Sequence, residues 1–148
     1  MKNPYKLSVA STMVCGVSAL MLSAQAAYAD TIEVTVSDID VSYGKIGCAL
    51  HADASRFPME PPTRPVQWLD VAGVEVVCAF TNVKPGFYAI SVAHDRNGNQ
   101  RTDTNFLGIP TEEWGVSGNT RPNLRAPRFD EAQFEFTGQP LVLTIEID

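Results

Sequence analysis

The sequence has little positive charge and few of the residues on which common enzymes depend. It carries 11 Lys and Arg against 17 Asp and Glu, a net charge of −6. Long-range repulsion then opposes encounters with nucleic acids and anionic membrane surfaces, so neither is expected as a partner. With only 2 His and 3 Cys, the chain has no C-x-x-C redox motif, and it also lacks a G-x-S-x-G nucleophile motif. Repeats and low-complexity tracts are missing too, which favours one ordinary domain.

Charge is absent altogether from Leu7 to Ala29, and this run predicts an export signal. The run follows two lysines and ends on the small-x-small order of residues 27–29. We expect cleavage of 1–29 as a signal peptide, which leaves a periplasmic or secreted domain at 30–148 with a net charge of −8. The run is also long enough to be an uncleaved anchor. Its polar residues and the lack of a basic flank favour cleavage, so no stable membrane insertion is expected.

Two cysteines remain after cleavage, Cys48 and Cys78. Each shares the phase of the apolar residues in its own alternating segment, 45–51 and 74–80, so both sulfurs point to the buried face. In an oxidising compartment this pair predicts a disulfide, provided that the two strands are neighbours or face each other across a sandwich. Two buried free thiols are the alternative.

Alternation of apolar and polar residues with a period of two dominates the rest of the chain, and no window shows a convincing amphipathic helix. The expected strands are 32–36, 45–52, 74–80, 88–92, 134–136 and 141–147. Short strands separated by Gly, Pro and Asn turns are typical of an all-β, antiparallel β-sandwich with Greek-key-like connections. A small open barrel is the structural alternative.

One long segment, 95–130, breaks the alternation. Loops of this length inside a compact domain are usually functional or disordered. Large apolar residues predict that this loop is ordered and packed. They are Phe106, Leu107, Ile109, Trp114 and Leu124.

The start of this loop is a candidate calcium site. Its oxygen-bearing side chains alternate along a turn, and a hard cation such as calcium takes six to eight oxygens. They are Asp95, Asn97, Asn99 and Asp103. Gln100 and Phe106 stand where a helical calcium loop has Gly and Glu, so the site is not an EF-hand. The alternative is a set of Asx turns that closes without an ion.

The same region is also a candidate ligand surface, with Trp as a stacking platform and arginines as bidentate donors for an anionic or sugar-like ligand. Its residues are His94, Trp114, Arg121, Arg125 and Arg128. We expect His94 to be partly buried and to orient the loop, because it shares the inward phase of its strand. His51 has the opposite phase, which argues against a two-histidine metal site. Alternatively, the arginines pair with Glu112, Glu113 and Asp130.

Two blocks of sequence resemble a bacterial family of secreted proteins known as domain of unknown function family 2141. The first is HDRNGNQRTDTNFLGIPTEEWGVS, from His94 to Ser117, and the second is APRFDEAQFEFTG, from Ala126 to Gly138. The resemblance extends over nearly the whole domain. It implies an exported, all-β, immunoglobulin-like or transthyretin-like fold with no assigned activity.

These observations favour a non-enzymatic binding or envelope-associated module, with an envelope protein or a glycan as partner and calcium as the candidate cofactor. A small secreted hydrolase or carbohydrate-active enzyme is one alternative, and it would use paired carboxylates among Glu112, Glu113 and Asp130. A carrier of small apolar ligands is another. A carrier needs a cavity, whereas the aromatic residues of the strands predict a filled core.

Overall fold

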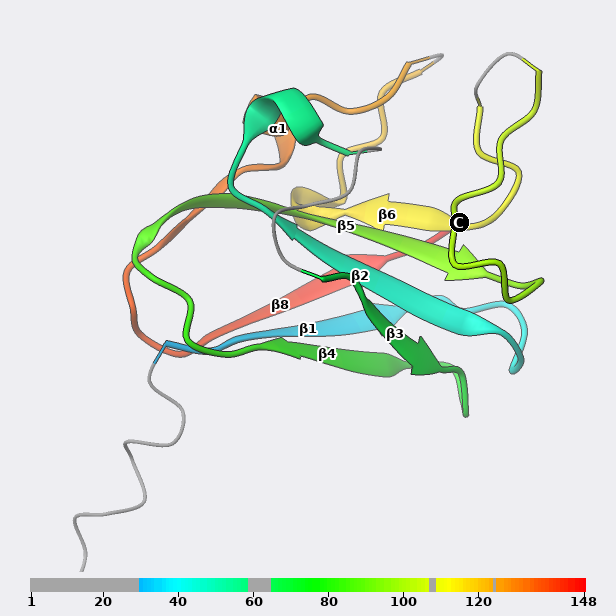
Figure 1. Cartoon of the computed structure of the whole chain (residues 1–148), viewed down its shortest axis with the longest axis horizontal. Coiled ribbons are helices and arrows are strands. Elements are labelled where there is room, and N and C mark those ends of the chain that lie inside the picture. The colour runs from blue at the N-terminus through cyan, green and yellow to red at the C-terminus, as the bar shows by residue number, and fades with distance from the viewer. Residues whose placement is uncertain (1–29, 59–64, 107–108, 124) are drawn as a thin grey trace, which may run out of the picture.

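Two β-sheets pack face to face in this protein (Figure 1). The computed structural model describes residues 30–58, 65–106, 109–123 and 125–148, and the expected signal peptide at 1–29 lies outside them. Across those described residues, no helix has the length and apolar character needed to span a membrane.

The smaller sheet has the strand order β4 (Val76–Phe80), β1 (Ile32–Ser37), β8 (Leu141–Glu146). The larger has the order β3 (Gln67–Asp70), β2 (Lys45–His51), β5 (Gly86–Asp95), β6 (Trp114–Val116), and β7 (Phe134–Phe136) pairs with the start of β5. In the described part of the chain, three short helical segments lie between strands of the larger sheet: η1 (Ala54–Arg56), η2 (Ser117–Asn119) and α1 (Phe129–Ala132).

The alternation in the sequence produces this core directly. In β1, Ile32, Val34 and Val36 are fully buried while the residues between them are only partly covered. The inward residues of β2, β4 and β5 fill the space between the sheets, together with Phe136, although β2 is buried on both faces. The prediction of a β-sandwich is therefore confirmed at the level of two packed sheets.

Three details of the prediction are wrong. The sheets are not purely antiparallel, because β1 pairs with β8 in parallel; the order of pairing depends on how the chain returns, which alternation does not encode. The strand expected at 74 begins at Val76, and Val74 is 74% exposed. Segment 95–130 contains β6 and α1, which at three and four residues are too short to show a period.

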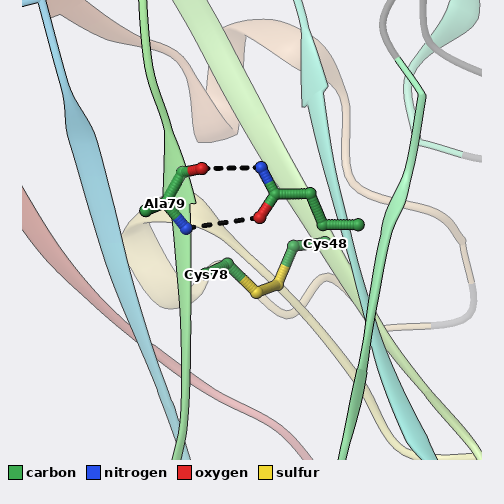
Figure 2. Close-up of a disulfide and its surroundings, with 4 residues drawn as sticks. Cys48, Cys78 and Ala79 are labelled. Atoms are coloured by element: carbon green, nitrogen blue, oxygen red, sulfur yellow. Dashed lines mark hydrogen bonds between the residues drawn. A yellow bond between two sulfur atoms is a disulfide. The ribbon is translucent and has the colours of Figure 1, made fainter.

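The predicted disulfide is present, and it joins the two sheets. Cys48 lies in β2 and Cys78 in β4, with a Cα–Cα distance of 6.5 Å and both residues fully buried (Figure 2). Beside it, the Gln67 side chain accepts a hydrogen bond from the Ala79 N–H at 3.3 Å and donates to the Ala79 carbonyl oxygen at 2.7 Å. A covalent bond and a paired amide therefore close the β3/β4 edge of the sandwich.

The opposite edge is closed by close packing of β6 against β8. Trp114 N–H donates to the Asp148 carbonyl oxygen at 3.2 Å, and the Arg121 guanidinium donates to the Glu146 carbonyl oxygen at 2.9 Å. Gly115 lies where a Cβ atom would collide with that same Glu146 oxygen and with Ile145. This approach of the two sheets requires glycine.

Gly115→Ala is accordingly expected to lower the free energy of unfolding by about 1 to 3 kcal/mol, the usual cost of overpacking. Urea unfolding at neutral pH measures the change. Gly73→Ala is the matched control, because a Cβ atom there would meet nothing within 4 Å. Equal stability of the two variants would contradict the close approach of β6 and β8.

Candidate functional site

The end of β5 begins the region that the sequence singles out. Asp95 is fully buried, and its carboxylate accepts three backbone hydrogen bonds, from Gly98 at 2.7 Å, Asn99 at 3.1 Å and Gln100 at 2.6 Å. Gly98 and Gln100 take positive φ values of 78° and 58°, which wrap the backbone around the carboxylate. The turn is thus organised by Asp95 itself, as an Asx turn is.

Three of the four candidate calcium ligands are joined by side-chain hydrogen bonds, but the donors are amide N–H groups. Asn97 Nδ2 donates to one carboxylate oxygen of Asp103 at 2.6 Å, and Asn99 Nδ2 donates to the other at 2.9 Å. The two Asn side-chain oxygens accept backbone N–H groups of Asn99 and Arg101. An arriving ion would have to break these bonds to reach the oxygens.

Calcium binding here stays a prediction. Within the described ranges, no group of three or more His, Cys, Asp or Glu side chains is placed to hold a metal. The test is a calcium titration followed by melting temperature. If calcium binds and displaces the Asn97 and Asn99 amides from Asp103, the melting temperature should rise, because a ligand that binds only the folded state stabilises it. No shift at millimolar calcium would remove the hypothesis.

An arm that leaves the sheet after β5 and returns to it at β6 contains residues 95–106 and 109–113. Glu112 ties its two sides together, because one carboxylate oxygen accepts the Arg96 N–H at 2.9 Å and the other accepts the Asp103 N–H at 3.1 Å. Further out, Thr111 N–H donates to the Asp103 carbonyl oxygen at 2.9 Å. The arm projects from the end of the sandwich at which β5 stops, on the right of Figure 1.

A buried ion pair fixes the arm to the sheet. His94 Nδ1 lies 2.6 Å from the Glu113 carboxylate and His94 Nε2 lies 2.8 Å from the Tyr43 carbonyl oxygen. Both ring nitrogens of this buried histidine therefore lie beside an oxygen acceptor. The Arg96 guanidinium pairs with the same carboxylate. Burial raises the pKa of Glu113, but the His94 hydrogen bond and the Arg96 charge together hold that pKa below its usual value.

Two large apolar side chains of the arm are exposed. Phe106 is 95% exposed and Ile109 is 44% exposed, so the prediction that both pack inside the loop is wrong. Leu107 and Leu124 lie outside the described residues. Trp114 does pack, against a small cluster on the outer face of the larger sheet. Composition had predicted order in this loop, but it could not say which apolar residues face the body.

The residues of the predicted ligand surface have different partners. Arg121 lies 5.6 Å from the centre of the Trp114 ring and pairs with Asp148, while His94 faces the core. The other two arginines lie near α1. Arg125 bonds Glu131 at 2.6 Å, and Arg128 is 3.4 Å from both Asp130 and Glu131.

The Arg125 hydrogen bond, followed by the Arg128 N–H, lowers the pKa of Glu131 to about 2. The arginines therefore pair with acidic residues, as the alternative prediction states. Two of these acids, Glu131 and Asp148, were not predicted. Of the other two acids named in that prediction, Glu113 pairs with the Arg96 guanidinium, and Glu112 accepts the Arg96 backbone N–H.

His51 is buried on the face of the sheet opposite to His94, as its phase predicts. Its Nε2 lies 2.9 Å from Ser91 Oγ, which in turn lies 3.3 Å from the Pro58 carbonyl oxygen. Phe57 covers the ring edge-on at 5.3 Å, and Nδ1 is a buried atom without a hydrogen-bond partner. Burial lowers the pKa of His51 to about 4. The alternating phase located this residue on its face but gave no sign of its burial.

An acid-sensitive stability is expected from this histidine. Its folded pKa lies below the unfolded value of 6.5, so between pH 6.5 and about 4 the unfolded chain binds a proton that the folded chain does not. Stability should fall by about 3 kcal/mol across that window. NMR titration can follow the chain's 2 histidines directly. If the His51 ring titrates near 6.5, its burial is contradicted.

Comparison with known proteins adds the family. No curated protein and no solved structure matches the chain. A family model described as an uncharacterized protein conserved in bacteria, DUF2141, matches residues 34–143. This span runs from β1 into β8 and includes the whole arm, together with both sequence blocks that resemble the family. The chain therefore belongs to the DUF2141 family of bacterial proteins.

Proposed function

We propose that this chain is an exported, non-enzymatic binding module of the bacterial envelope, and that the arm is its binding element. The observation that carries the proposal is the 95% exposure of Phe106 on an arm with a tightly bonded base. Aromatic residues dominate the binding energy of protein interfaces, and exposed apolar patches mark such surfaces. Phe106 and Ile109 are the residues that a partner would cover.

The construction of the arm's base supports this role. Buried ion pairs contribute little net stability compared with apolar packing, and where they help they fix one conformation. The base contains such a group, formed by His94, Glu113 and Arg96. Next to it, the carboxylates of Asp95 and Glu112 accept hydrogen bonds from backbone N–H groups. A side chain presented on a rigid base loses less entropy on binding.

Export is the second part of the proposal. The Cys48–Cys78 disulfide is typical of an oxidising compartment, and the uncharged run at 1–29 supplies a signal. Fractionation of producing cells should place the protein in the periplasm or medium, with Asp30 as its first residue. The finer description of the fold as immunoglobulin-like or transthyretin-like belongs to the same proposal.

The bonding of the acidic residues favours binding over hydrolysis. Glu112 and Glu113 are occupied by the groups that hold the arm, and Asp130 pairs with Arg128 on α1. Ser91 lies beside His51, but the low pKa of His51 makes it a weak base. A protein partner is favoured over a glycan, because Arg121 already lies over the Trp114 ring.

A photo-crosslinking amino acid at position 106 tests the proposal in cells that export the protein. The matched control is position 87, since Phe87 is 59% exposed at the opposite end of β5. We expect a discrete crosslinked product from position 106 and none from position 87. Equal crosslinking from the two positions, or none from either, would overturn the arm as the binding element.

A further inference from the structure

A pocket lies at the same end of the sandwich as the arm. It is lined by residues at the end of β1 and just after it, and by residues just before β4, and its volume is about 340 Å³. The lining residues are Ser37, Asp38, Ile39, Asp40, Val74 and Glu75. The register pairs Val36 with Val76 and Lys45 with Asp95, and a short connection joins the end of β1 to the start of β2. The pocket and the arm therefore lie at one end of the sandwich, and the ends of β1 and β5 are on the right of Figure 1.

The pocket and the arm are complementary in chemistry. Ile39 and Val74 give the pocket an apolar part, and three carboxylates surround it. The arm presents the Phe106 ring and, on its exposed side, the Arg101 guanidinium. None of the salt bridges in the part of the chain that the structure describes includes Arg101 or any of these carboxylates.

We propose that the partner of the arm is a second copy of this chain, an inference that rests on the proposed binding role of the arm. Phe106 of each copy enters the pocket of the other, and Arg101 pairs with the carboxylates there. Because arm and pocket lie at the same end, each copy gives its arm and receives its partner's. Such reciprocal contacts close into a two-fold dimer.

Charge and size indicate how strong this dimer is. The expected net charge of −8 on the exported chain opposes the approach of two copies, but screening at physiological salt confines this repulsion to about 8 Å. Within that distance, Arg101 of one copy meets the carboxylates of the other copy's pocket. The contacts are small compared with the roughly 1,200 to 2,000 Å² of a stable interface. The dimer is therefore weak and depends on concentration. A lipid surface is disfavoured, because single anchors bind membranes only marginally.

Analytical ultracentrifugation of the exported protein over a wide concentration range tests the inference. Phe106→Ser should weaken dimerisation by about a hundredfold, since the two-fold dimer loses two rings at about tenfold each. Phe87→Ser, at the other end of β5, should leave the dimer unchanged. Arg101→Glu and Glu75→Arg should each weaken it, and the double variant should restore it if the two side chains meet.

Three results would overturn the inference: a monomer at every concentration, a dimer that Phe106→Ser leaves intact, or charge reversals that the double variant does not restore. Crosslinking from position 106 separates this inference from the proposed function. A product of twice the chain mass, joined to residues 37–40 or 74–75, supports both. A product with a different protein, from a chain that stays monomeric, supports the binding module and overturns self-association.

Discussion

Replacing Glu113 with Gln is expected to lower the free energy of unfolding by about 3 to 5 kcal/mol, the cost of breaking one partner of a buried ion pair. Gln keeps the shape of the side chain and removes its charge. The fully buried His94 then loses its carboxylate partner, and Arg96 loses its ion-pair partner as well. The amide has no negative charge to offer the Arg96 guanidinium.

Urea unfolding at pH 7 measures this change, and Glu112→Gln is the neighbouring control. Glu112 accepts two backbone N–H groups and no salt bridge to it is described. Its amide variant retains one acceptor, so a loss of about 1 kcal/mol is expected. Equal losses at the two positions would show that the charge on Glu113 has no special role.

The same pair of proteins gives a second measurement in acid. Because the folded pKa of Glu113 is lowered, the stability from its charge is present above its unfolded pKa of about 4.5 and is lost as pH falls through the folded value. The difference between wild type and Glu113→Gln should shrink below about pH 4.5. His51 contributes equally to both proteins, so its own acid effect cancels. A difference that stays constant to pH 3 would assign the loss to packing.

The sequence predicts the long strands well because one face of each is buried. In β1 and β5 alternation alone identifies the inward residues, and the same phase places Cys48 and Cys78 in the core. It misses β3 and β6, which are four and three residues long. The parallel pairing of β1 with β8 is also missed, since a period of two is the same in either direction.

The arm shows where local reasoning stops. Asx turns around Asp95 follow from residues within five positions of it, so the sequence could predict them. The pairing of His94 with Glu113 joins residues 19 apart and exists only because β6 returns beside β5. Phe106 illustrates the opposite case: its apolar character predicts burial, and only the path of the backbone leaves it exposed.

Removing the disulfide with Cys48→Ala and Cys78→Ala together is expected to cost about 3 to 4 kcal/mol. The bond closes a loop with a sequence separation of 30 residues, and the chain-entropy model gives a loss of this size for such a loop. The cysteines join the two sheets through the core, so the unfolded chain gains freedom over β3 and the connections around it.

Gln67→Ala is the comparison, because the Gln67 side chain links the same edge without a covalent bond. Its two hydrogen bonds to Ala79 predict a loss of about 1 to 2 kcal/mol. In the disulfide-free chain the loss from Gln67→Ala should change, since neighbouring links are energetically coupled. If the free energy of unfolding of the chain without cysteines lies within about 1 kcal/mol of the wild-type value, the disulfide contributes little to holding β2 against β4. The large expected loss instead assigns the closure of this edge to the one covalent bond that crosses it.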